Sequence, residues 1–533
     1  MQHTALPSRL VVFHYHLRPG GVTTVIVDGL SALAAEWERI GGGGRLAATV
    51  VCGSSDNVES VKTRLAAAGI DIEMVVDPVF GYSEVEQSQD DVTAIAHRLS
   101  TRFADRDALW WVHNYHLGKN PAFSAALIDV LQMVPSQRAL LQIHDFPECA
   151  RPQNLAALNS VLTVDPYPRQ ANLLYVVINE RDRRLLMDAG IPQSQLFLLD
   201  NPVRTESLEP SAEPVDVRAA LARLPSVTRC DHKKPWLVYP VRCIRRKNVL
   251  EAALLSAMVD ANLVVTLPGT SEAEKPYSDM VESAFLDGTI EGVWSAGTRI
   301  DELGYSFRDL IGAADAIVSS SVQEGFGFQY VSAAAWGKPL FARYLDVLDG
   351  ILPVFEGFPA QFYDRVLVPF ETPTLSNYRP YLQMRYGETD APGIDDLLSG
   401  HLIDFSYLSG NLQLAILKDL HDNGFKEHLR AINSDLITRL IEVIGASPAP
   451  LLSRIKERFG ARAFADRFVG AVDALAGLER TNDTAPADAR AEVADTATKA
   501  CAPSRPVQDK LTTAFGTIEY RRLLYAAPER LSH

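Results

Sequence analysis

The feature that most constrains the fold of this chain is a regular alternation of short apolar runs with amphipathic stretches. Up to about residue 200 the apolar runs have the length of buried strands. They cover 9–14, 46–52, 72–76, 108–113, 138–144 and 174–178. Segments between them, among them 22–35, 91–103, 121–134 and 180–189, are predicted as helices. Strands that alternate with helices predict right-handed crossovers and therefore a parallel, doubly wound sheet.

A second alternation of the same kind begins near residue 236. Its predicted strands are 236–241, 262–267, 292–295, 316–319 and 339–342. The chain has 533 residues, which is too long for a single hydrophobic core. We therefore predict an α/β protein with two Rossmann-like, doubly wound parallel-sheet domains. Ligands of such sheets bind beyond the carboxyl ends of the strands, so functional residues are expected there.

Three segments outside the alternations set the expected domain boundaries. Residues 206–234 are polar and carry one short predicted helix, 451–475 form an amphipathic pattern, and 479–507 lack periodicity and are typical of a disordered linker. Apolar side chains near the end of the chain, among them Phe515 and Tyr520, are enough to dock on a surface, and the sequence does not indicate which one. The expected parts are a first domain 1–205, a linker 206–234, a second domain 235–445, a C-terminal helix 446–478, and a flexible linker and tail 479–533.

Charge and cysteine content narrow the function classes. The formal net charge of −15 argues against nucleic acid and anionic lipid as partners, because both require a basic surface. No apolar run approaches the roughly 18–20 residues of a membrane helix, so no transmembrane segment is expected. The five cysteines are scattered and lack C-x-x-C spacing, which suits a reducing, cytoplasmic location. They are Cys52, Cys149, Cys230, Cys243 and Cys501.

The most specific segment of the sequence is 318–340. A predicted strand ends in serines, Glu324-Gly325-Phe326-Gly327 forms a sharp turn, and a helix of small and apolar residues follows. The glycines let a ligand approach the backbone, and the helix N-terminus offers free N–H groups. A carboxylate at this place can accept hydrogen bonds from two adjacent sugar hydroxyls. The turn is therefore predicted to bind a sugar.

A basic cluster follows the first predicted strand of the second domain. It contains Arg242, Arg245, Arg246 and Lys247 in a chain that is otherwise acidic. Such a cluster at the end of a strand can hold an anion in the crevice of the sheet. We expect Arg242 and Lys247 to do so, and Arg245 and Arg246 to be solvated.

A glycine pair connects the first predicted strand of the chain to the helix after it. Gly20 and Gly21 lie just before that helix. Backbone N–H groups at such a helix start can lie beside a phosphate. Alone, the pair is a weak signal.

Two groups of polar residues follow predicted strands of the first domain. The first group is His113, Asn114, His116, Lys119 and Asn120, and the second is His144 and Asp145. A single histidine is more often structural, but five polar side chains within eight residues at a strand end favour a pocket for a substrate. Zinc binding by the histidines is disfavoured, because no cysteine or carboxylate stands at a supporting spacing.

Together these segments resemble the retaining GT-B glycosyltransferases of the glycosyltransferase family 4 type (glycosyl transferases group 1), which include bacterial mannosyltransferases and sucrose-phosphate synthases. In that family a glutamate opens the turn and a second one, which holds the nucleotide ribose, follows eight positions later. Here Glu324 is present, but the second position is Ser332. The resemblance implies two Rossmann-like domains that face a central cleft, with the acceptor side in the first and the nucleotide-sugar side in the second.

The resemblance also implies roles for the candidate residues. Glu324 would orient the donor sugar, Arg242 and Lys247 would grip the donor diphosphate, and His144 would reach the reacting sugar. The implied donor-binding set is Gly20, Gly21, Arg242, Lys247, Glu324, Gly325, Phe326, Gly327 and Ser332. The implied acceptor-binding set is His113, Asn114, His116, Lys119, Asn120 and Asp145. The nucleotide-diphosphate sugar is the co-substrate, and no metal ion or further cofactor is implied.

The expected function is retaining transfer of a hexose from a nucleotide-diphosphate sugar to a small polar or anionic soluble acceptor. The acceptor hydroxyl would attack the face from which the nucleotide leaves. An anionic acceptor is expected because Lys119 and two histidines form a local cationic group in an acidic chain. Two alternatives stay open. One is an inactive sugar-nucleotide-binding scaffold, which would account for Ser332 and the unusual tail, and the other is a sugar-nucleotide epimerase.

Overall fold

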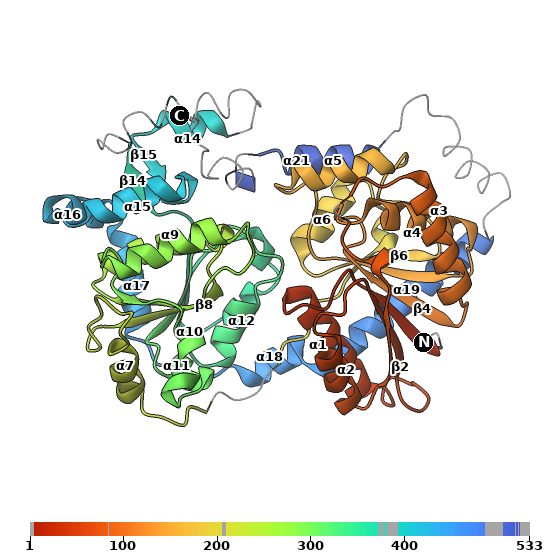
Figure 1. Cartoon of the computed structure of the whole chain (residues 1–533), viewed down its shortest axis with the longest axis horizontal. Helices are drawn as coiled ribbons and strands as arrows, with labels where there is room; N and C mark the ends of the chain where they lie inside the picture. Colours follow the sequence, from red (N-terminus) through yellow and green to blue (C-terminus); the bar gives the residue numbers. More distant parts are fainter. Residues whose placement is uncertain are drawn as a thin grey trace. The chain divides into compact units, whose positions relative to one another are not determined.

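The chain folds into two compact units in a computed structural model. Unit 1 comprises Met1–Arg204 and Lys456–Phe515, and unit 2 comprises Thr205–Ile455 and Gly516–His533. The structure describes residues 5–83, 85–204, 209–370, 375, 378, 380, 393–484, 505–517, 519–520 and 522. Each unit contains a sheet with helices on both of its faces (Figure 1). In the described part of the chain, no helix is long and apolar enough to span a bilayer.

Unit 1 is built on a seven-stranded, wholly parallel sheet in the order β3-β2-β1-β4-β5-β6-β7. The strands are β1 (Arg9–Phe13), β2 (Ala47–Cys52), β3 (Asp71–Val76), β4 (Ala108–His113), β5 (Arg138–Ile143), β6 (Leu173–Val177) and β7 (Leu196–Leu198). The order reverses between β1 and β4, so the crevice of this sheet lies at their carboxyl ends. The six predicted strands are confirmed, whereas the three-residue β7 was not predicted.

The helices of unit 1 cover both faces of this sheet. They are α1 (Gly21–Glu36), α2 (Val58–Ala67), α3 (Gln89–Arg98), α4 (Pro121–Met133), α5 (Pro152–Val161), α6 (Glu180–Ala189), α19 (Ala461–Thr484) and α21 (Pro506–Ala514). The last two come from the end of the sequence. Phe468 of α19 packs on Trp111 of β4, with ring centroids 5.6 Å apart. The C-terminal part of the chain therefore completes the core of the first domain.

The predicted single helix over 451–475 is wrong. The structure has two helices there, α18 (Leu452–Phe459) and α19, and they are separated at Gly460. A Cβ atom at Gly460 would lie 2.4 Å from the carbonyl oxygen of Lys456, so glycine permits this tight junction. α19 also extends to Thr484, into the segment predicted as a disordered linker. Residues 485–504, the rest of that linker, lie outside the described residues.

Unit 2 is built on a six-stranded parallel sheet in the order β10-β9-β8-β11-β12-β13. Its strands are β8 (Trp236–Arg242), β9 (Asn262–Leu267), β10 (Gly292–Val293), β11 (Ala316–Ser319), β12 (Leu340–Arg343) and β13 (Ala360–Tyr363). β14 (Leu367–Pro369) and β15 (Leu402–Asp404) form a separate antiparallel pair. The five predicted strands are confirmed, and the edge strand β13 was not predicted. Two Rossmann-like parallel-sheet domains, as in the GT-B class, are therefore confirmed.

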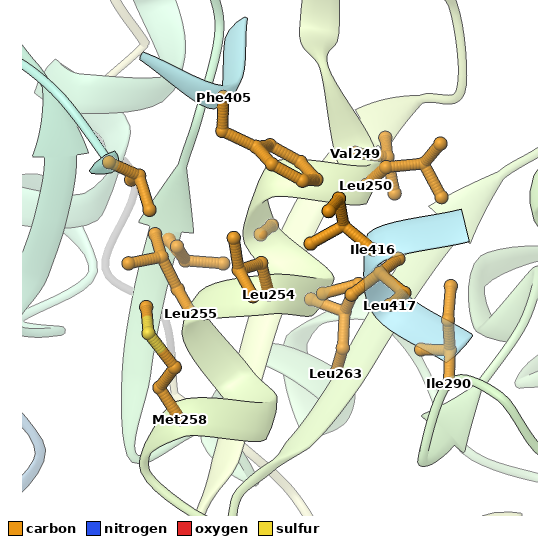
Figure 2. Close-up of a cluster of buried hydrophobic side chains, with 14 of the residues drawn as sticks. Val249, Leu250, Leu254, Leu255, Met258, Leu263, Ile290, Phe405, Ile416 and Leu417 are labelled. Carbon is orange, nitrogen blue, oxygen red and sulfur yellow. The ribbon is translucent and has the colours of Figure 1, made fainter. Parts of the chain in front are cut away.

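The helices of unit 2 begin with α7, the short helix predicted within 206–234. They are α7 (Pro214–Ala222), α8 (Val249–Met258), α9 (Lys275–Leu286), α10 (Ala296–Arg299), α11 (Phe307–Gly312), α12 (Phe328–Ala335), α14 (Ile394–Ser399), α15 (Gly410–Asp419), α16 (Asn423–Ile432) and α17 (Ser434–Ile444). α8 is apolar on nearly all sides, which is typical of a fully buried helix. Figure 2 shows Leu250 and Leu254 of α8 near Ile416 and Leu417 of α15 and Phe405.

One carboxylate is buried in this apolar helix. Glu251 of α8 is fully buried and pairs with Arg343 at the end of β12, with 2.7 Å between Oε2 and Nη2. The same guanidinium lies 2.9 Å from Asp404, and the Tyr363 hydroxyl donates to Glu251 Oε1 over 2.8 Å. A buried charge requires such partners. This network ties α8, β12, β13 and β15 together beneath the carboxyl edge of the sheet.

Candidate active site

The turn after β11 and the turn after β8 meet at the carboxyl edge of the unit 2 sheet. β8 and β11 are neighbours, so the residues that follow them lie close together. The Lys247 ammonium forms an ion pair with Oε1 of Glu324, and both side chains are nearly buried (13% and 11% exposed). Ser321 donates to the same oxygen over 2.6 Å, and Arg246 lies 3.4 Å from Oε2. Two cations thus surround one carboxylate.

The charges at this site are fixed by their partners. Burial alone would raise the pKa of Glu324, but Lys247 and Arg246 outweigh it and hold that pKa below its ordinary value. Burial also lowers the pKa of Lys247, against the opposing effect of Glu324. Glu324 is therefore an ionised carboxylate at neutral pH, able to accept hydrogen bonds from hydroxyl groups.

Backbone contacts hold the two turns against each other. The hydroxyl of Tyr239 in β8 donates to the carbonyl oxygen of Lys247 over 2.8 Å, and that of Ser320 donates to the carbonyl oxygen of Asn248 over 2.9 Å. The N–H of Val322 donates to the carbonyl oxygen of Arg246 over 2.9 Å. The geometry of the pair is therefore set by the fold before any ligand binds.

The Gly325–Gly327 part of the turn leads into α12. Gly327 has φ of 99°, in the left-handed region that favours glycine, and a Cβ atom there would lie 3.0 Å from Leu348. Phe326 is buried, with its ring 5.0 Å from that of Phe328. Ser332 is half-buried on α12. The turn thus directs the chain sharply into the helix, as the sequence predicted.

Of the remaining basic residues of this edge, Arg245 and Arg246 differ from expectation, whereas the expected role of Arg242 stays a prediction. Arg242 does not bond to Glu324 but lies 3.4 Å from Glu274, with 42% of its side chain exposed. Arg245 was predicted to be solvated, yet it donates to the carbonyl oxygen of Leu408 over 2.9 Å. Arg246, also predicted to be solvated, joins the Glu324 site. The sequence of a basic cluster does not indicate which of its side chains form tertiary contacts.

Buried histidines gather at the carboxyl edge of the unit 1 sheet. His113 Nδ1 and His144 Nε2 are 2.9 Å apart, and the two rings stack. The ring centroid of His14 lies 6.3 Å from that of His113. Burial lowers the pKa of His14 to about 3 and that of His144 to about 4, and it also lowers the pKa of His113. All three rings are therefore neutral at pH 7. Within the described residues no group of three or more His, Cys, Asp or Glu is arranged to hold a metal ion.

Two predicted acceptor-binding amides are engaged within the fold. Asn114 has φ of 54°, and its Oδ1 accepts from the N–H of His144 over 2.8 Å. Asn120 caps α4 through the N–H of Phe123 at 3.0 Å and donates to the carbonyl oxygen of Gly81 over 2.7 Å. These contacts position the loops after β4 and β5. A role of either amide in acceptor binding stays a prediction.

The predicted His116 is fully buried between aromatic rings. Its ring lies 5.3 Å from that of Tyr167 and 6.0 Å from that of Phe146. Burial lowers its pKa to about 3, although Asp145 opposes the shift. His116 is thus neutral, and the expectation that it adds positive charge is wrong. A role of His116 in acceptor binding stays a prediction.

Cations lie at the rim of this edge. Lys119 Nζ lies 5.4 Å above the ring of Tyr82, and burial and the nearby Arg151 lower its pKa. Arg151 precedes α5 and pairs with Asp145 over 2.9 Å. The Tyr82 hydroxyl also lies 3.2 Å from His16 Nε2. The sequence identified Lys119 and Asp145 but missed Arg151 and Tyr82, because no spacing links them to the first group.

The predicted glycine pair lies in an exposed loop at the start of α1. The Gly20 carbonyl oxygen accepts from the N–H of Thr24 over 3.0 Å. A Cβ atom at Gly21 would meet nothing within 4 Å, so the fold itself does not require glycine there. The helix start is open, as a phosphate would require.

No protein-family model matches the chain. Mannosylglucosyl-3-phosphoglycerate synthase of Petrotoga mobilis (strain DSM 10674 / SJ95) is 28% identical over 451 residues, which cover 81% of this chain and 85% of that protein.

Solved glycosyltransferases are also similar in structure. Anabaena HepE in complex with UDP is 12% identical and covers 87% of this chain and 100% of its own, with a TM-score of 0.48. The lipopolysaccharide outer core galactosyltransferase WaaB is 13% identical and covers 87% and 98%, with a TM-score of 0.46. Over 81% of its length the chain is thus similar to an enzyme, the synthase of Petrotoga mobilis.

Proposed function

We propose that this enzyme transfers a hexose from a nucleotide-diphosphate sugar to a small anionic acceptor with retention of configuration. The observation that carries the proposal is the buried Lys247–Glu324 pair at the carboxyl edge of the unit 2 sheet. A carboxylate held there can bind two hydroxyls of the donor sugar. Arg246 and Lys247 together carry more positive charge than Glu324 neutralises, and this excess favours a diphosphate.

The proposed reaction is a substitution on one face of the sugar. The bond between the anomeric carbon and the phosphate oxygen breaks, and a bond from the acceptor oxygen forms on the same face. The acceptor proton passes to the departing phosphate oxygen. Charge grows on that oxygen as the bond breaks, and Lys247 and Arg242 would stabilise it by several kcal/mol in a dry site. Glu324 would hold the sugar in place, and His144 would lie at the reacting hydroxyl.

The acceptor would be held by unit 1. Lys119 and Arg151 offer positive charge at the rim, beside neutral histidines that can bond to hydroxyls. The Petrotoga relative is named for a product that contains 3-phosphoglycerate. A phosphoglycerate has both a phosphate and a carboxylate, which suits this cationic rim. We therefore propose a glycoside of phosphoglycerate as the acceptor class and mannose as the first hexose to test.

No metal ion and no cofactor besides the donor enters this proposal, and we place the enzyme in the cytoplasm. The four described cysteines, Cys52, Cys149, Cys230 and Cys243, are free thiols, as is usual in a reducing compartment.

Because no metal ion takes part in the proposed reaction, turnover should be unchanged by EDTA. A loss of turnover in EDTA that Mg²⁺ or Mn²⁺ restores would contradict the metal-free mechanism.

The donor and the acceptor can be tested in sequence. A thermal-shift screen of UDP-, GDP- and ADP-sugars should give one clear binder, since a ligand at 100 times its Kd adds about 2.7 kcal/mol. That donor is then combined with glucosyl-3-phosphoglycerate and with glucosylglycerol, its uncharged counterpart. Transfer to the charged acceptor with a retained anomer by NMR is expected. An inverted anomer, or equal transfer to the neutral acceptor, would contradict the proposal.

Lys119→Ala tests the acceptor rim, with the exposed Lys62→Ala as the matched control. At saturating donor, Lys119→Ala should raise the acceptor KM by roughly 10-fold, the usual weight of one charge-assisted contact. The donor KM should not change. An unchanged acceptor dependence would remove Lys119 from the acceptor site.

A further inference from the structure

The end of the chain reaches the donor half of the enzyme. After α21, which belongs to unit 1, residues from Gly516 onward belong to unit 2. Within this tail Arg522 is buried, with 5% of its side chain exposed. Besides Glu519, 4.0 Å away, its partners lie far away in the sequence, at Val322 and at Ser406 and Tyr407. A guanidinium is rarely buried unless it is paired and hydrogen-bonded, so these contacts are specific.

Arg522 holds the backbone just before the catalytic carboxylate. Its Nη2 donates to the carbonyl oxygen of Val322 over 3.2 Å, two residues before Glu324. Its Nη1 donates to the Ser406 hydroxyl over 3.2 Å, and its guanidinium lies 5.5 Å above the ring of Tyr407. Because the Val322 N–H already bonds to Arg246, Arg522 fixes this residue from its other side.

Tyr520 holds the far end of the same turn. Its hydroxyl donates to Asp346, which begins a short 3₁₀ turn with Leu348. Leu348 is the side chain that packs 3.0 Å from the position of a Cβ atom at Gly327. The two tail residues therefore brace the Glu324–Gly327 turn at both of its ends.

We propose that Arg522, together with Tyr520, belongs to the donor site and that Arg522 is a positioning residue for Glu324. Without Arg522 the Val322 carbonyl oxygen loses a charged donor, and the turn gains freedom at the point where the carboxylate must stay aligned. Arg522 makes no contact with Glu324 itself among the described residues, so it acts through the backbone. The catalytic consequence rests on the proposed function, whereas the bracing of the turn does not.

Hydrogen exchange tests the bracing without any substrate. In full-length Arg522→Ala, peptides that cover 320–328 should exchange at least 10-fold faster than in wild type, and peptides of β8 should not change. Arg439→Ala is the matched control, because Arg439 also donates to a unit 2 carbonyl oxygen, that of Phe362, at 3.0 Å. Unchanged exchange over 320–328, or acceleration spread over the whole of unit 2, would overturn the proposal.

Two milder variants keep the proposal testable if Arg522→Ala does not fold. Arg522→Lys keeps one charged donor and should restore most of the protection over 320–328. Tyr520→Phe removes the hydroxyl that donates to Asp346 and should accelerate exchange at the Gly327 end of the turn alone. Equal exchange over 320–328 in Arg522→Lys and Arg522→Ala would show that the donor contact is not what braces the turn.

Kinetics then separate a positioning role from a structural one. Arg522→Ala should lower kcat about 10-fold and raise the donor KM, leave the acceptor KM unchanged, and recover in Arg522→Lys. If hydrogen exchange changes as predicted but no sugar is transferred even by wild type, the proposed function fails and the bracing stands. If wild type is active and kcat of Arg522→Ala is normal, the positioning role is wrong.

Discussion

The candidate functional residues of both units lie at the carboxyl edge of a parallel sheet. The units differ in whether the ionisable side chains buried there are charged or neutral. In unit 2 a buried carboxylate stays charged because Lys247 and Arg246 compensate it. In unit 1 the buried rings of His14, His113 and His144 become neutral instead, since burial lowers their pKa values. Near these rings, Lys119 and Arg151 carry positive charge at the rim.

The difference fits the two tasks that the proposed reaction would give the units. A donor diphosphate brings charge that grows during bond cleavage, so fixed charges at the unit 2 edge lower the barrier. An acceptor hydroxyl is neutral when it arrives, and neutral imidazoles can bond to it without the desolvation of a charge. The comparison predicts that unit 2 is sensitive to loss of one ionic partner, and unit 1 to a change in pH.

The largest effect is expected from Lys247→Ala. This change leaves Glu324 buried without its nearest cation, and breaking a buried pair from one side costs about 3 kcal/mol. Turnover should fall by at least about 10²-fold, because a group that stabilises the leaving oxygen is lost. Urea unfolding and steady-state rates at saturating substrates measure the two effects. A folded Lys247→Ala enzyme with near-normal turnover would remove Lys247 from the mechanism.

Arg242→Ala is the comparison variant for Lys247. Its side chain is exposed and pairs loosely with Glu274, so its loss should change the unfolding free energy by less than about 0.5 kcal/mol. Turnover should still fall by about 10²-fold if Arg242 grips the diphosphate. If Arg242→Ala lowers the unfolding free energy but not the turnover, then Arg242 stabilises the fold and does not grip the diphosphate.

Much of the fold was predictable from the sequence, because buried parallel strands form continuous apolar runs. The two strands that were missed, β7 and β13, are short edge strands, and β13 (Ala360–Tyr363) mixes polar and apolar residues. The break at Gly460 was missed because the apolar periodicity continues across it.

Of the candidate site, only the residues that follow adjacent strands could be predicted to lie together. Lys247 and Glu324 follow β8 and β11, and neighbouring parallel strands bring their ends together. Arg522 reaches its place from a distant segment, and Arg151 reaches Asp145 only because the loop before α5 folds back. Such contacts leave no local pattern, so only the tertiary structure reveals them.

A pH titration should separate the two units. In the unfolded chain a histidine titrates near pH 6.5, whereas the folded values of His14, His116 and His144 are about 3 to 4. The unfolded state therefore takes up protons first, and the stability of unit 1 falls as the pH drops below about 6.5. Each such histidine contributes a loss of about 1.4 kcal/mol per pH unit until its folded pKa is reached.

Unit 2 should resist the same pH change. The pKa of Glu324 is lowered in the folded state, so its pair is weakened only below the ordinary carboxyl range. Protection of β4 and β8 amides at pH 7.0 and 5.5, corrected for intrinsic exchange, measures both units. His116→Gln should make the unit 1 slope shallower, and the exposed His97→Gln should not. Parallel loss of protection in both units would break the comparison.

The smallest effect is expected at Ser332, where the family pattern has a glutamate. Ser332 is half-buried on α12, so Ser332→Glu should fold normally and change the unfolding free energy by less than about 0.5 kcal/mol. A carboxylate there could bond to the ribose hydroxyls and tighten donor binding by up to about 10-fold, or about 1.4 kcal/mol. Ser332→Gln is the control of equal length without the charge. Calorimetry with the donor identified by the screen measures both variants. If Ser332→Glu abolishes binding of every nucleotide sugar while Ser332→Gln retains it, then the donor approaches this helix in a different pose, and the likeness to the family ends at Glu324.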